Sequence, residues 1–437
     1  MNFQKYIIVA MALWLIACGN FTAKVASNVA TSIAATQQAD GTSQTADNTA
    51  LPADTTAITK PAKATPASKP TTKPAKATPA SKPTAKPVKA TPVPATTDYQ
   101  AINDEVDAFF GEFINEKTPG GVVIVLQDGQ IIHQAAYGLA NLKKKTPLTV
   151  NHMFHLASMG KQMTAMAIMM LAEQGKLDYD DPISKYIPEI SQFGDTFTIR
   201  QVLHHTSGLP DYSDGITDAL MKRSDNPTNE DMIAVLHKKR KLLAAPGDAF
   251  YYSNAGYDML AVLIERVSGE SFPDFVQTHI FDPLKMKSTF SLPNKKRRAD
   301  PLVTISYTGS SDAPEAYPND PLDNIYGSGS IYSTIGDMAL YDEALYGDTL
   351  VSQKTYQEAL KPATLNDGSV EQYGFGLEFE KWKKETYVAH SGVWLGFNND
   401  YVRFPQRHFS VIVLLNRDYE YPDNPRIALK VAEFYLK

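Results

Sequence analysis

Residues 154–161 read Phe-His-Leu-Ala-Ser-Met-Gly-Lys and run directly into an apolar segment at 163–171. We predict that this segment is a helix and that Ser158 stands in its first turn. Residues three apart share one helix face, so the amine of Lys161 should lie beside the serine hydroxyl. A desolvated lysine can take the proton of a serine and make it a nucleophile. Because Ser-x-x-Lys arises by chance in most chains of this length, the rest of the chain decides its meaning.

Composition and charge limit the possible classes of protein. The chain has 437 residues, of which 43 % are hydrophobic and 10 % aromatic, as is typical of a soluble globular protein. Residues 1–97 carry 10 Lys+Arg and 3 Asp+Glu, whereas residues 98–437 carry 32 Lys+Arg and 45 Asp+Glu. This acidic body argues against nucleic acid as a partner. Cys18 is the only cysteine, so an internal disulfide is excluded.

The N-terminus has the features of an export signal. A lysine precedes the apolar run 6–17, which is too short to span a bilayer comfortably as a mature helix. The run ends in Leu-Ile-Ala-Cys, which resembles the lipobox of a bacterial lipoprotein signal peptide. We expect removal of residues 1–17 and lipidation of Cys18 by acyl chains that anchor the protein to the membrane. An ordinary signal peptide with an incidental cysteine is the alternative. Gly19, in place of aspartate, implies an outer-membrane address facing the periplasm.

Residues 18–97 are expected to form a disordered tether. After Cys18 they contain mainly Ala, Thr, Ser, Gln, Pro and Lys, and so cannot bury enough surface to fold. A 13-residue repeat begins at Lys60 and again at Lys73. Nine prolines in residues 60–94 favour an extended spacer with a reach of roughly 110 Å, at ~3.1 Å per residue. A solvated spacer is the favoured interpretation, and contact with anionic envelope polymers or peptidoglycan is the weaker one.

Residues 98–437 are expected to hold one folded domain. Near its start, a helical pattern at 101–115 precedes strand patterns at 121–127 and 130–137, which flank the hairpin signal Asp128-Gly129. Helical patterns fill the middle of the chain. Late strand patterns lie at 374–379, 386–390, 397–404 and 409–415, and a last helix is expected at 425–436.

This order of elements predicts a mixed α/β fold of the α+β type. The simplest closure joins the early and late strands in one antiparallel sheet, flanked on one face by the N- and C-terminal helices. The middle of the chain then forms a separate, mainly helical lobe. We expect the functional site in a cleft between the sheet and the lobe.

A second candidate motif is Tyr252-Ser253-Asn254, in a loop rich in aromatic residues. A tyrosine two residues before an asparagine can place a hydroxyl and an amide on the same side. The amide would fix a substrate carbonyl, and the phenol would relay a proton if nearby cations lowered its pKa from about 10. Tyr251 is the rival, but it stands three residues from Asn254, so we choose Tyr252.

A third candidate motif, His390-Ser391-Gly392, ends a late strand pattern. On an edge strand such a triplet would line a cleft, and its glycine would let the backbone approach the substrate closely. The N–H groups of Val393 and Ser158 would then form an oxyanion hole. Alone, this motif is near chance.

The three motifs together, in this order and with similar spacing, resemble the serine β-lactamase and penicillin-binding-protein superfamily. The matching branch holds class C β-lactamases, DD-peptidases, D-aminopeptidases and related esterases. The stretches at 203–209 and 326–329, Leu-His-His-Thr-Ser-Gly-Leu and Tyr-Gly-Ser-Gly, also resemble that branch. The likeness covers about residues 101–437 and implies a β-lactamase/transpeptidase-like fold.

The resemblance implies catalytic roles for four residues. Ser158 would be the acylated nucleophile, and Lys161 and Tyr252 would share the general-base and general-acid work. The N–H groups of Ser158 and Val393 would form the oxyanion hole. Neither a cofactor nor a metal is implied.

Substrate binding is implied for Asn254, which would hold the acyl side chain, and for the triplet His390, Ser391 and Gly392. His390 is a departure, because many β-lactamases have lysine at that position. Lysine offers a fixed positive charge to a substrate carboxylate, whereas histidine is mostly neutral near pH 7. Peptide or ester substrates therefore gain weight over β-lactams.

Other histidines have structural interpretations. His204 and His205 lack nearby acidic ligands, so a structural loop is favoured over a metal site. For His152 and His155, packing is favoured over a place in the cleft. The basic run at 295–298 is interpreted as a solvated loop.

Two functional hypotheses follow. The first is an envelope-anchored serine hydrolase that forms an acyl-enzyme on Ser158 and acts on amide or ester bonds. D-amino-acid peptides, peptidoglycan-type substrates and esters come before β-lactams among its expected substrates. The alternative is a low-turnover penicillin-binding or cell-wall binding lipoprotein. The intact Ser158, Lys161 and Tyr252 argue against this alternative.

Overall fold

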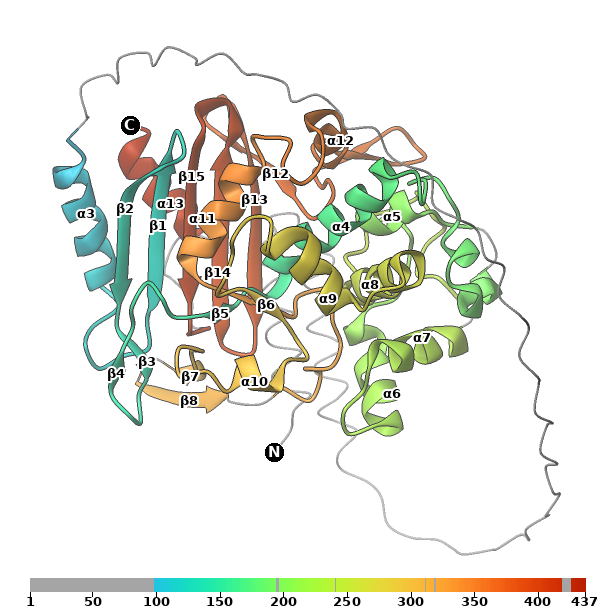
Figure 1. Ribbon diagram of the computed structural model, residues 1–437, viewed down its shortest axis with the longest axis horizontal. Coiled ribbons are helices and arrows are strands. Elements are labelled where there is room, and N and C mark those ends of the chain that lie inside the picture. Colours follow the sequence, from blue (N-terminus) through green and yellow to red (C-terminus); the bar gives the residue numbers. More distant parts are fainter. Residues whose placement is uncertain (1–97, 194–195, 240, 311, 318–319, 419–425) are drawn as a thin grey trace, which may run out of the picture. The chain divides into compact units, whose positions relative to one another are not determined.

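A six-stranded antiparallel sheet combines strands from both ends of the folded chain (Figure 1). The computed structural model describes residues 98–437 except 194–195, 240, 311, 318–319 and 419–425, so the leader, Cys18 and the tether lie outside the described residues. The prediction of one antiparallel sheet is confirmed. Its strands, in spatial order, are β12 (Glu378–Trp382), β13 (Glu385–Trp394), β14 (Phe397–Phe404), β15 (Phe409–Leu415), β1 (Gly121–Gln127) and β2 (Gln130–Tyr137).

Strand β1 lies inside the sheet and is buried on both faces. Val122 and Ile124 pack with the core of the helical lobe, whereas Val123 and Val125 pack with the terminal helices. All four side chains are fully buried. Because neither face meets water, the strand is a continuous apolar run and not an alternating one.

Helices cover both faces of the sheet. The terminal helices α3 (Gln100–Gly111) and α13 (Ile427–Tyr435) share one face, as predicted, and Phe109 lies 5.9 Å from Phe434 between ring centroids. Helix α11 (Ile335–Ala344) packs on the other face against β1 and β15 (Figure 1). Across the described residues, no helix combines the length and the apolar content that crossing a bilayer requires.

The strand bounds test the sequence patterns directly. The patterns at 121–127, 130–137, 397–404 and 409–415 coincide with β1, β2, β14 and β15. Asp128 and Gly129 both have positive φ, as a type I′ hairpin turn requires.

The pattern at 374–379 is a wrong prediction, because β12 begins only at Glu378. Gly374 is pressed against α12 (Gln353–Ala359), where an added Cβ would lie 2.1 Å from the carbonyl oxygen of Ala359. Gly376 then adopts a φ of +69°, which ends the extended run. A close contact and a turn therefore replace the expected strand.

Two buried helices organise the mainly helical lobe, α4 (Lys161–Glu173) and α8 (Asn254–Ser268). The smaller helices around them are η1 (Ala157–Gly160), η2 (Ile183–Lys185), η3 (Pro188–Phe193), α5 (Ile199–Leu203), η4 (Tyr212–Asp214), α6 (Ile216–Arg223), α7 (Asn229–Lys238), α9 (Phe272–Val276), η5 (Gln277–Phe281) and α10 (Lys295–Arg298).

Short strands that the sequence did not indicate join the lobe to the sheet. A three-stranded sheet, β5–β9–β6, places the residues just before Ser158 beside those just after the 326–329 loop. The short elements are β3 (Leu139–Asn141), β4 (Thr146–Pro147), β5 (Phe154–His155), β6 (Phe290–Ser291), β7 (Ser306–Ser310), β8 (Ala313–Tyr317), β9 (Ile331–Ser333), β10 (Ala363–Thr364), β11 (Val370–Glu371) and η6 (Pro405–Arg407).

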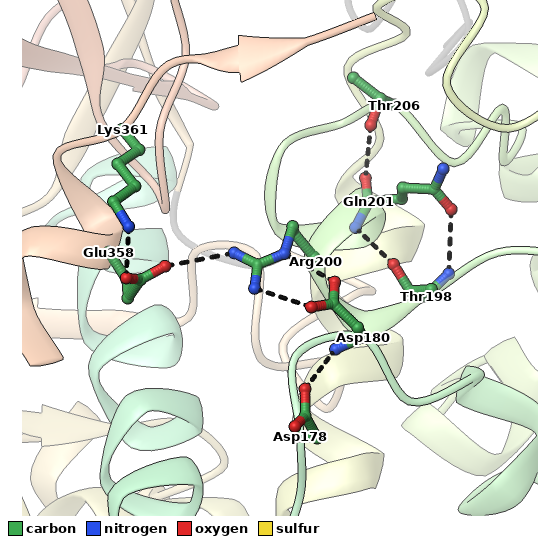
Figure 2. A network of polar contacts seen from close by, with 8 residues as sticks. All are labelled: Asp178, Asp180, Thr198, Arg200, Gln201, Thr206, Glu358 and Lys361. Atoms are coloured by element: carbon green, nitrogen blue, oxygen red, sulfur yellow. Dashed lines mark hydrogen bonds and ion pairs between the residues drawn. The ribbon is translucent and has the colours of Figure 1, made fainter. Parts of the chain in front are cut away.

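A polar network fixes helix α5 (Figure 2). Thr198 and Gln201 form a capping box at its N-terminus, which satisfies backbone N–H groups that have no partner inside the helix. Arg200 donates to both carboxylate oxygens of Asp180, at 2.7 and 3.0 Å, and reaches Glu358 of α12 at 3.4 Å. These contacts hold the end of α5, and therefore His204 and His205 that follow it.

A second ion network ties α13 to the sheet. Arg426, at the start of α13, donates to Asp400 of β14 at 3.0 Å and to Glu380 of β12 at 2.6 Å, and it also pairs with Glu378. The side chains of Arg426, Glu378 and Asp400 are 9 %, 14 % and 6 % exposed. Buried carboxylates of this kind depend on their cation.

Replacing Arg426 should therefore destabilise the fold. We expect Arg426→Met to lower the free energy of unfolding by about 3–5 kcal/mol, because two buried carboxylates lose their counter-charge. Urea denaturation followed by circular dichroism measures this change. The matched control is Arg407→Met, which breaks the exposed pair with Glu385 and should leave the midpoint almost unchanged. Equal midpoints for the two variants would contradict this account.

Candidate active site

Ser158 stands in a strained turn at the N-terminus of α4. The turn is a 3-10 helix, Ala157–Gly160, and α4 itself begins at Lys161, three residues later than predicted. Ala157 has a φ of +50°, an unfavourable conformation for a residue with a side chain. Gly329 packs against it so closely that an added Cβ would lie 2.9 Å from the Ala157 carbonyl carbon. Close packing of Gly329 thus holds the strained backbone beside Ser158 in place.

Lys161 is fully buried and has three polar neighbours. Its Nζ lies 3.1 Å from Ser158 Oγ, 2.7 Å from Asn254 Oδ1 and 2.8 Å from the carbonyl oxygen of Ser328. These partners come from η1, from α8 and from the 326–329 loop. The predicted approach of Lys161 to Ser158 is present.

The chemistry of these partners orients the lysine amine. Asn254 Oδ1 and the Ser328 carbonyl can only accept hydrogen bonds, so they take two N–H groups of Lys161. A neutral amine has two N–H groups and one lone pair. When Lys161 is neutral, its lone pair therefore faces the Ser158 hydroxyl.

Burial favours this neutral form. It lowers the pKa of Lys161 to about 7, although the carboxylates of Asp258 and Asp211 act in the opposite direction. Asp258 accepts hydrogen bonds from Tyr212 Oη at 2.6 Å and from the Ser328 N–H at 2.9 Å. Burial also raises the pKa of Asp258, to about 6. The lysine can therefore change charge near neutral pH.

Asn254 is the first residue of α8, and Asp211 holds it in place. Asp211 accepts from the Asn254 N–H at 2.7 Å, from the Ala255 N–H at 3.2 Å and from Asn254 Nδ2 at 3.0 Å. A carboxylate is favourable there, because the first N–H groups of a helix lack internal partners. The bond from Nδ2 also fixes which end of the amide faces Lys161. One N–H of the amide is left for a ligand.

Tyr252, and not Tyr251, belongs to this cluster. Lys161 Nζ lies 4.8 Å from the centre of the Tyr252 ring, whereas Tyr251 is 40 % exposed. The ring of His205 packs on Tyr252 with centroids 4.2 Å apart. Burial raises the pKa of Tyr252 well above 10, and a hydrogen bond with Ser158 only partly offsets it. Because burial raises this pKa, the phenol stays protonated, and the condition that nearby cations lower the pKa is not met.

His390, the first residue of the third motif, lies inside the protein. Its ring is fully buried, with Nε2 3.0 Å from Tyr373 Oη and Nδ1 2.6 Å from the carbonyl oxygen of Ser391. That carbonyl only accepts, so Nδ1 carries the proton and Nε2 accepts from Tyr373. Burial lowers the pKa of His390 to about 3. His390 is therefore a buried, neutral residue within β13, and its predicted contact with substrate stays a prediction.

The strand that carries the third motif is not the edge of the sheet. β12 pairs with β13 only up to Ala389, and beyond this point no described strand covers that side of β13. Gly392 there touches the turn of Ser158, since an added Cβ would lie 2.1 Å from the Leu156 carbonyl oxygen. Gly392 thus lets the sheet pack closely against the lobe. The next residue, Val393, lines a pocket.

This pocket, which we call the Ser158 pocket, has about 440 Å³ of space including its open mouth. Ser158, Asn254, Val393, Trp394 and Tyr212 line it. Val393 and Trp394 belong to the sheet, whereas Asn254 and Tyr212 belong to the helical lobe. The predicted cleft between sheet and lobe is therefore present.

The histidines outside the motifs can now be placed. His155 was expected to pack, and it is both buried and part of the pocket lining. His204 and His205 are buried, and they bond to the Tyr373 carbonyl and to the Ser253 N–H. Within the described residues, no three His, Cys, Asp or Glu side chains gather as a metal site requires.

Three important residues were missed from the sequence, namely Asp211, Asp258 and Ser328. Two weak signals were available. Asp258 follows Asn254 by one helical turn, and Ser328 lies in the glycine-rich loop at 326–329. Asp211 carried no local signal, because its role depends on the approach of α8.

Comparison with known proteins gives the family. A family model described as Beta-lactamase matches residues 105–436. The chain belongs to the Beta-lactamase family. A penicillin-binding protein of Bacillus subtilis (strain 168) is 33 % identical over an alignment of 329 residues, which covers 72 % of this chain and 72 % of its own.

Two further similar proteins support the same family assignment. A D-aminopeptidase of Cereibacter sphaeroides (strain ATCC 17029 / ATH 2.4.9) is 25 % identical over 74 % of this chain and 61 % of its own. The octameric penicillin-binding protein homologue from Pyrococcus abyssi superposes with a TM-score of 0.66 at 25 % identity, over 78 % of this chain and 77 % of its own. The protein is therefore a serine hydrolase of the β-lactamase and penicillin-binding-protein superfamily.

Proposed function

We propose that this protein is an envelope-anchored serine hydrolase that forms an acyl-enzyme on Ser158. Its substrates would be amides or esters of D-amino-acid or peptidoglycan type. The orientation of the Lys161 amine carries the proposal, because two fixed acceptors leave its lone pair facing the Ser158 hydroxyl. The D-aminopeptidase and penicillin-binding relatives support the choice of substrate class.

In the first step, Ser158 Oγ attacks the substrate carbonyl carbon while Lys161 takes the hydroxyl proton. The C–O bond forms, and the carbonyl oxygen becomes an oxyanion. The N–H groups of Ser158 and Val393 are proposed to stabilise that oxyanion. Asn254 would hold the acyl portion with its remaining N–H.

The leaving group then needs a proton. Tyr252 is protonated and bonded to Ser158, so it can donate its proton to the leaving nitrogen or oxygen and recover one from Lys161. The bond to the leaving group breaks, and the acyl group stays on Ser158. Water then attacks the acyl carbon and its proton passes to neutral Lys161. The ester bond to Ser158 Oγ breaks, Oγ takes that proton back from Lys161, and the carboxylic acid product leaves.

The nucleophile can be tested directly. Ser158→Ala should abolish covalent labelling by a fluorophosphonate or a penicillin, and should lower turnover by something on the order of a million-fold. Mass spectrometry detects the adduct, and hydrolysis of a p-nitrophenyl ester measures turnover. Unchanged labelling would refute the proposal. Labelling of the native protein without steady-state turnover would instead favour the low-turnover penicillin-binding alternative.

The proposed base predicts a pH profile. Because Lys161 must be neutral to accept a proton and burial lowers its pKa to about 7, kcat/KM should rise through pH 7. Below that pH it should fall about tenfold per unit. Lys161→Arg should lose activity, since a guanidinium keeps its proton. A flat profile between pH 5 and 8 would rule out Lys161 as the base.

Envelope anchoring is the second part of the proposal. Cys18 follows an apolar leader of lipobox type, and the polar tether of residues 19–97 would separate a lipid anchor from the hydrolase domain. Lipidation on Cys18 would then fix the enzyme to the outer membrane, facing the periplasm.

Replacing the cysteine tests this anchor. We expect Cys18→Ser to move the protein from the membrane fraction to the soluble fraction and to prevent incorporation of labelled palmitate. Multiple acyl chains are needed for stable anchoring, so loss of the lipidated residue should be sufficient. Membrane retention equal to that of the native protein, with label still incorporated, would disprove lipidation at Cys18.

A further inference from the structure

Two aspartates outside the catalytic cluster contribute to the wall of the Ser158 pocket. Asp320 and Asp323 line the pocket, and within the described residues neither lysine nor arginine does. His155 is the one histidine of the lining, and burial lowers its pKa to about 3, so it is neutral. The described side chains that line the pocket thus include two carboxyl groups and no cationic group.

The two carboxylates differ in their bonding. Asp320 accepts from the Leu322 N–H at 2.9 Å and from the Trp394 indole N–H, so the protein holds both of its oxygens. The Asp323 carboxylate accepts no hydrogen bond from any described residue. Arg298, in an adjoining recess, favours the charged form of both carboxylates, but burial outweighs it and raises the pKa of each. Asp323 is therefore the carboxylate that has bonding capacity left.

A second observation points to a ligand. Ser330 lines the same pocket and is 5 % exposed, yet its hydroxyl has no hydrogen-bond partner in the described part of the chain. Buried hydroxyls are normally paired. Trp394 and Tyr212 add aromatic side chains to the lining, and aromatic faces attract cations. A carboxylate, an unpaired hydroxyl and aromatic rings together are the partners that an ammonium group requires.

We propose that the Ser158 pocket binds an ammonium group on the acyl portion of the substrate, with Asp323 as its direct contact and Asp320 as a supporting charge. This inference rests on the proposed serine hydrolase function and narrows its substrate class. Substrates whose recognised group is a carboxylate, β-lactams among them, would meet a pocket of the wrong sign.

Isosteric substrates test this specificity. The p-nitroanilides of D-alanine and of isobutyric acid differ by an ammonium in place of a methyl group, and an α-amine is mostly protonated at pH 7. We expect the ratio of their kcat/KM values to fall about tenfold in Asp323→Asn, because a charge-assisted hydrogen bond is lost. Asp323→Glu should keep most of the ratio. An unchanged ratio in Asp323→Asn would overturn the proposal.

The control is Asp128→Asn. Asp128 is an exposed carboxylate in the β1–β2 hairpin, next to Gln127, and Gln127 pairs with Phe409 at one end of the sheet. The pocket residues Val393 and Trp394 pair with the opposite end of β14, so Asp128 lies away from the pocket. This variant should keep the ratio of the native protein. A ratio that fell in both variants would indicate a general charge effect and would count against Asp323.

A competition experiment keeps the test independent of the chosen substrates. Benzylammonium should protect Ser158 from fluorophosphonate labelling better than benzyl alcohol does, and Asp323→Asn should remove that difference. Equal protection by the two compounds in the native protein would overturn the inference. Labelling that persists in Ser158→Ala would contradict the proposed function instead, so the two failures are distinguishable.

Discussion

The buried amine of Lys161 is the constraint on which the rest of the site depends. An amine without water must find its hydrogen-bond partners in the protein, because leaving them unmade is costly. Its three partners come from segments that are far apart in the chain, Ser158, Asn254 and Ser328. The fold therefore has to close around the lysine before the serine can be activated.

Two outer layers keep this arrangement in place. Asp211 and Asp258 hold the N-terminus of α8 and the 326–329 loop, and they also balance the charge of the lysine. The ring of His205 packs on Tyr252, and His205 follows α5 in the chain. The Arg200 network fixes the end of α5 (Figure 2). The positions of the catalytic groups thus depend on polar contacts that lie outside the catalytic cluster.

Much of the fold could be predicted from the sequence, because central strands and hairpins leave local patterns. Four strands and the Asp128-Gly129 turn are as predicted. The pattern at 374–379 predicted a strand that is mostly absent, because Gly374 packs on a helix from another part of the chain and this contact overrides the local β preference. Short strands such as β5, β6 and β9 have too few residues to leave a pattern.

The candidate site was only partly predictable. Spacing brought Ser158 and Lys161 together correctly, because residues three apart in one turn have little freedom. The environments of Tyr252 and His390 could not be predicted, because both are enclosed by aromatic rings from other segments, and burial raises the pKa of Tyr252 and lowers that of His390. Such enclosure is a property of the assembled fold and leaves no mark on the neighbouring sequence.

The contact of Gly392 with the Leu156 carbonyl has an evolutionary consequence. That position is closed to every other amino acid as long as the sheet and the nucleophile turn stay together. The pocket wall at residues 320–325 is under no such restriction, because it makes none of the bonds to Lys161. Descendants of this protein can therefore acquire new substrates by changing that wall, while the catalytic centre is inherited unaltered.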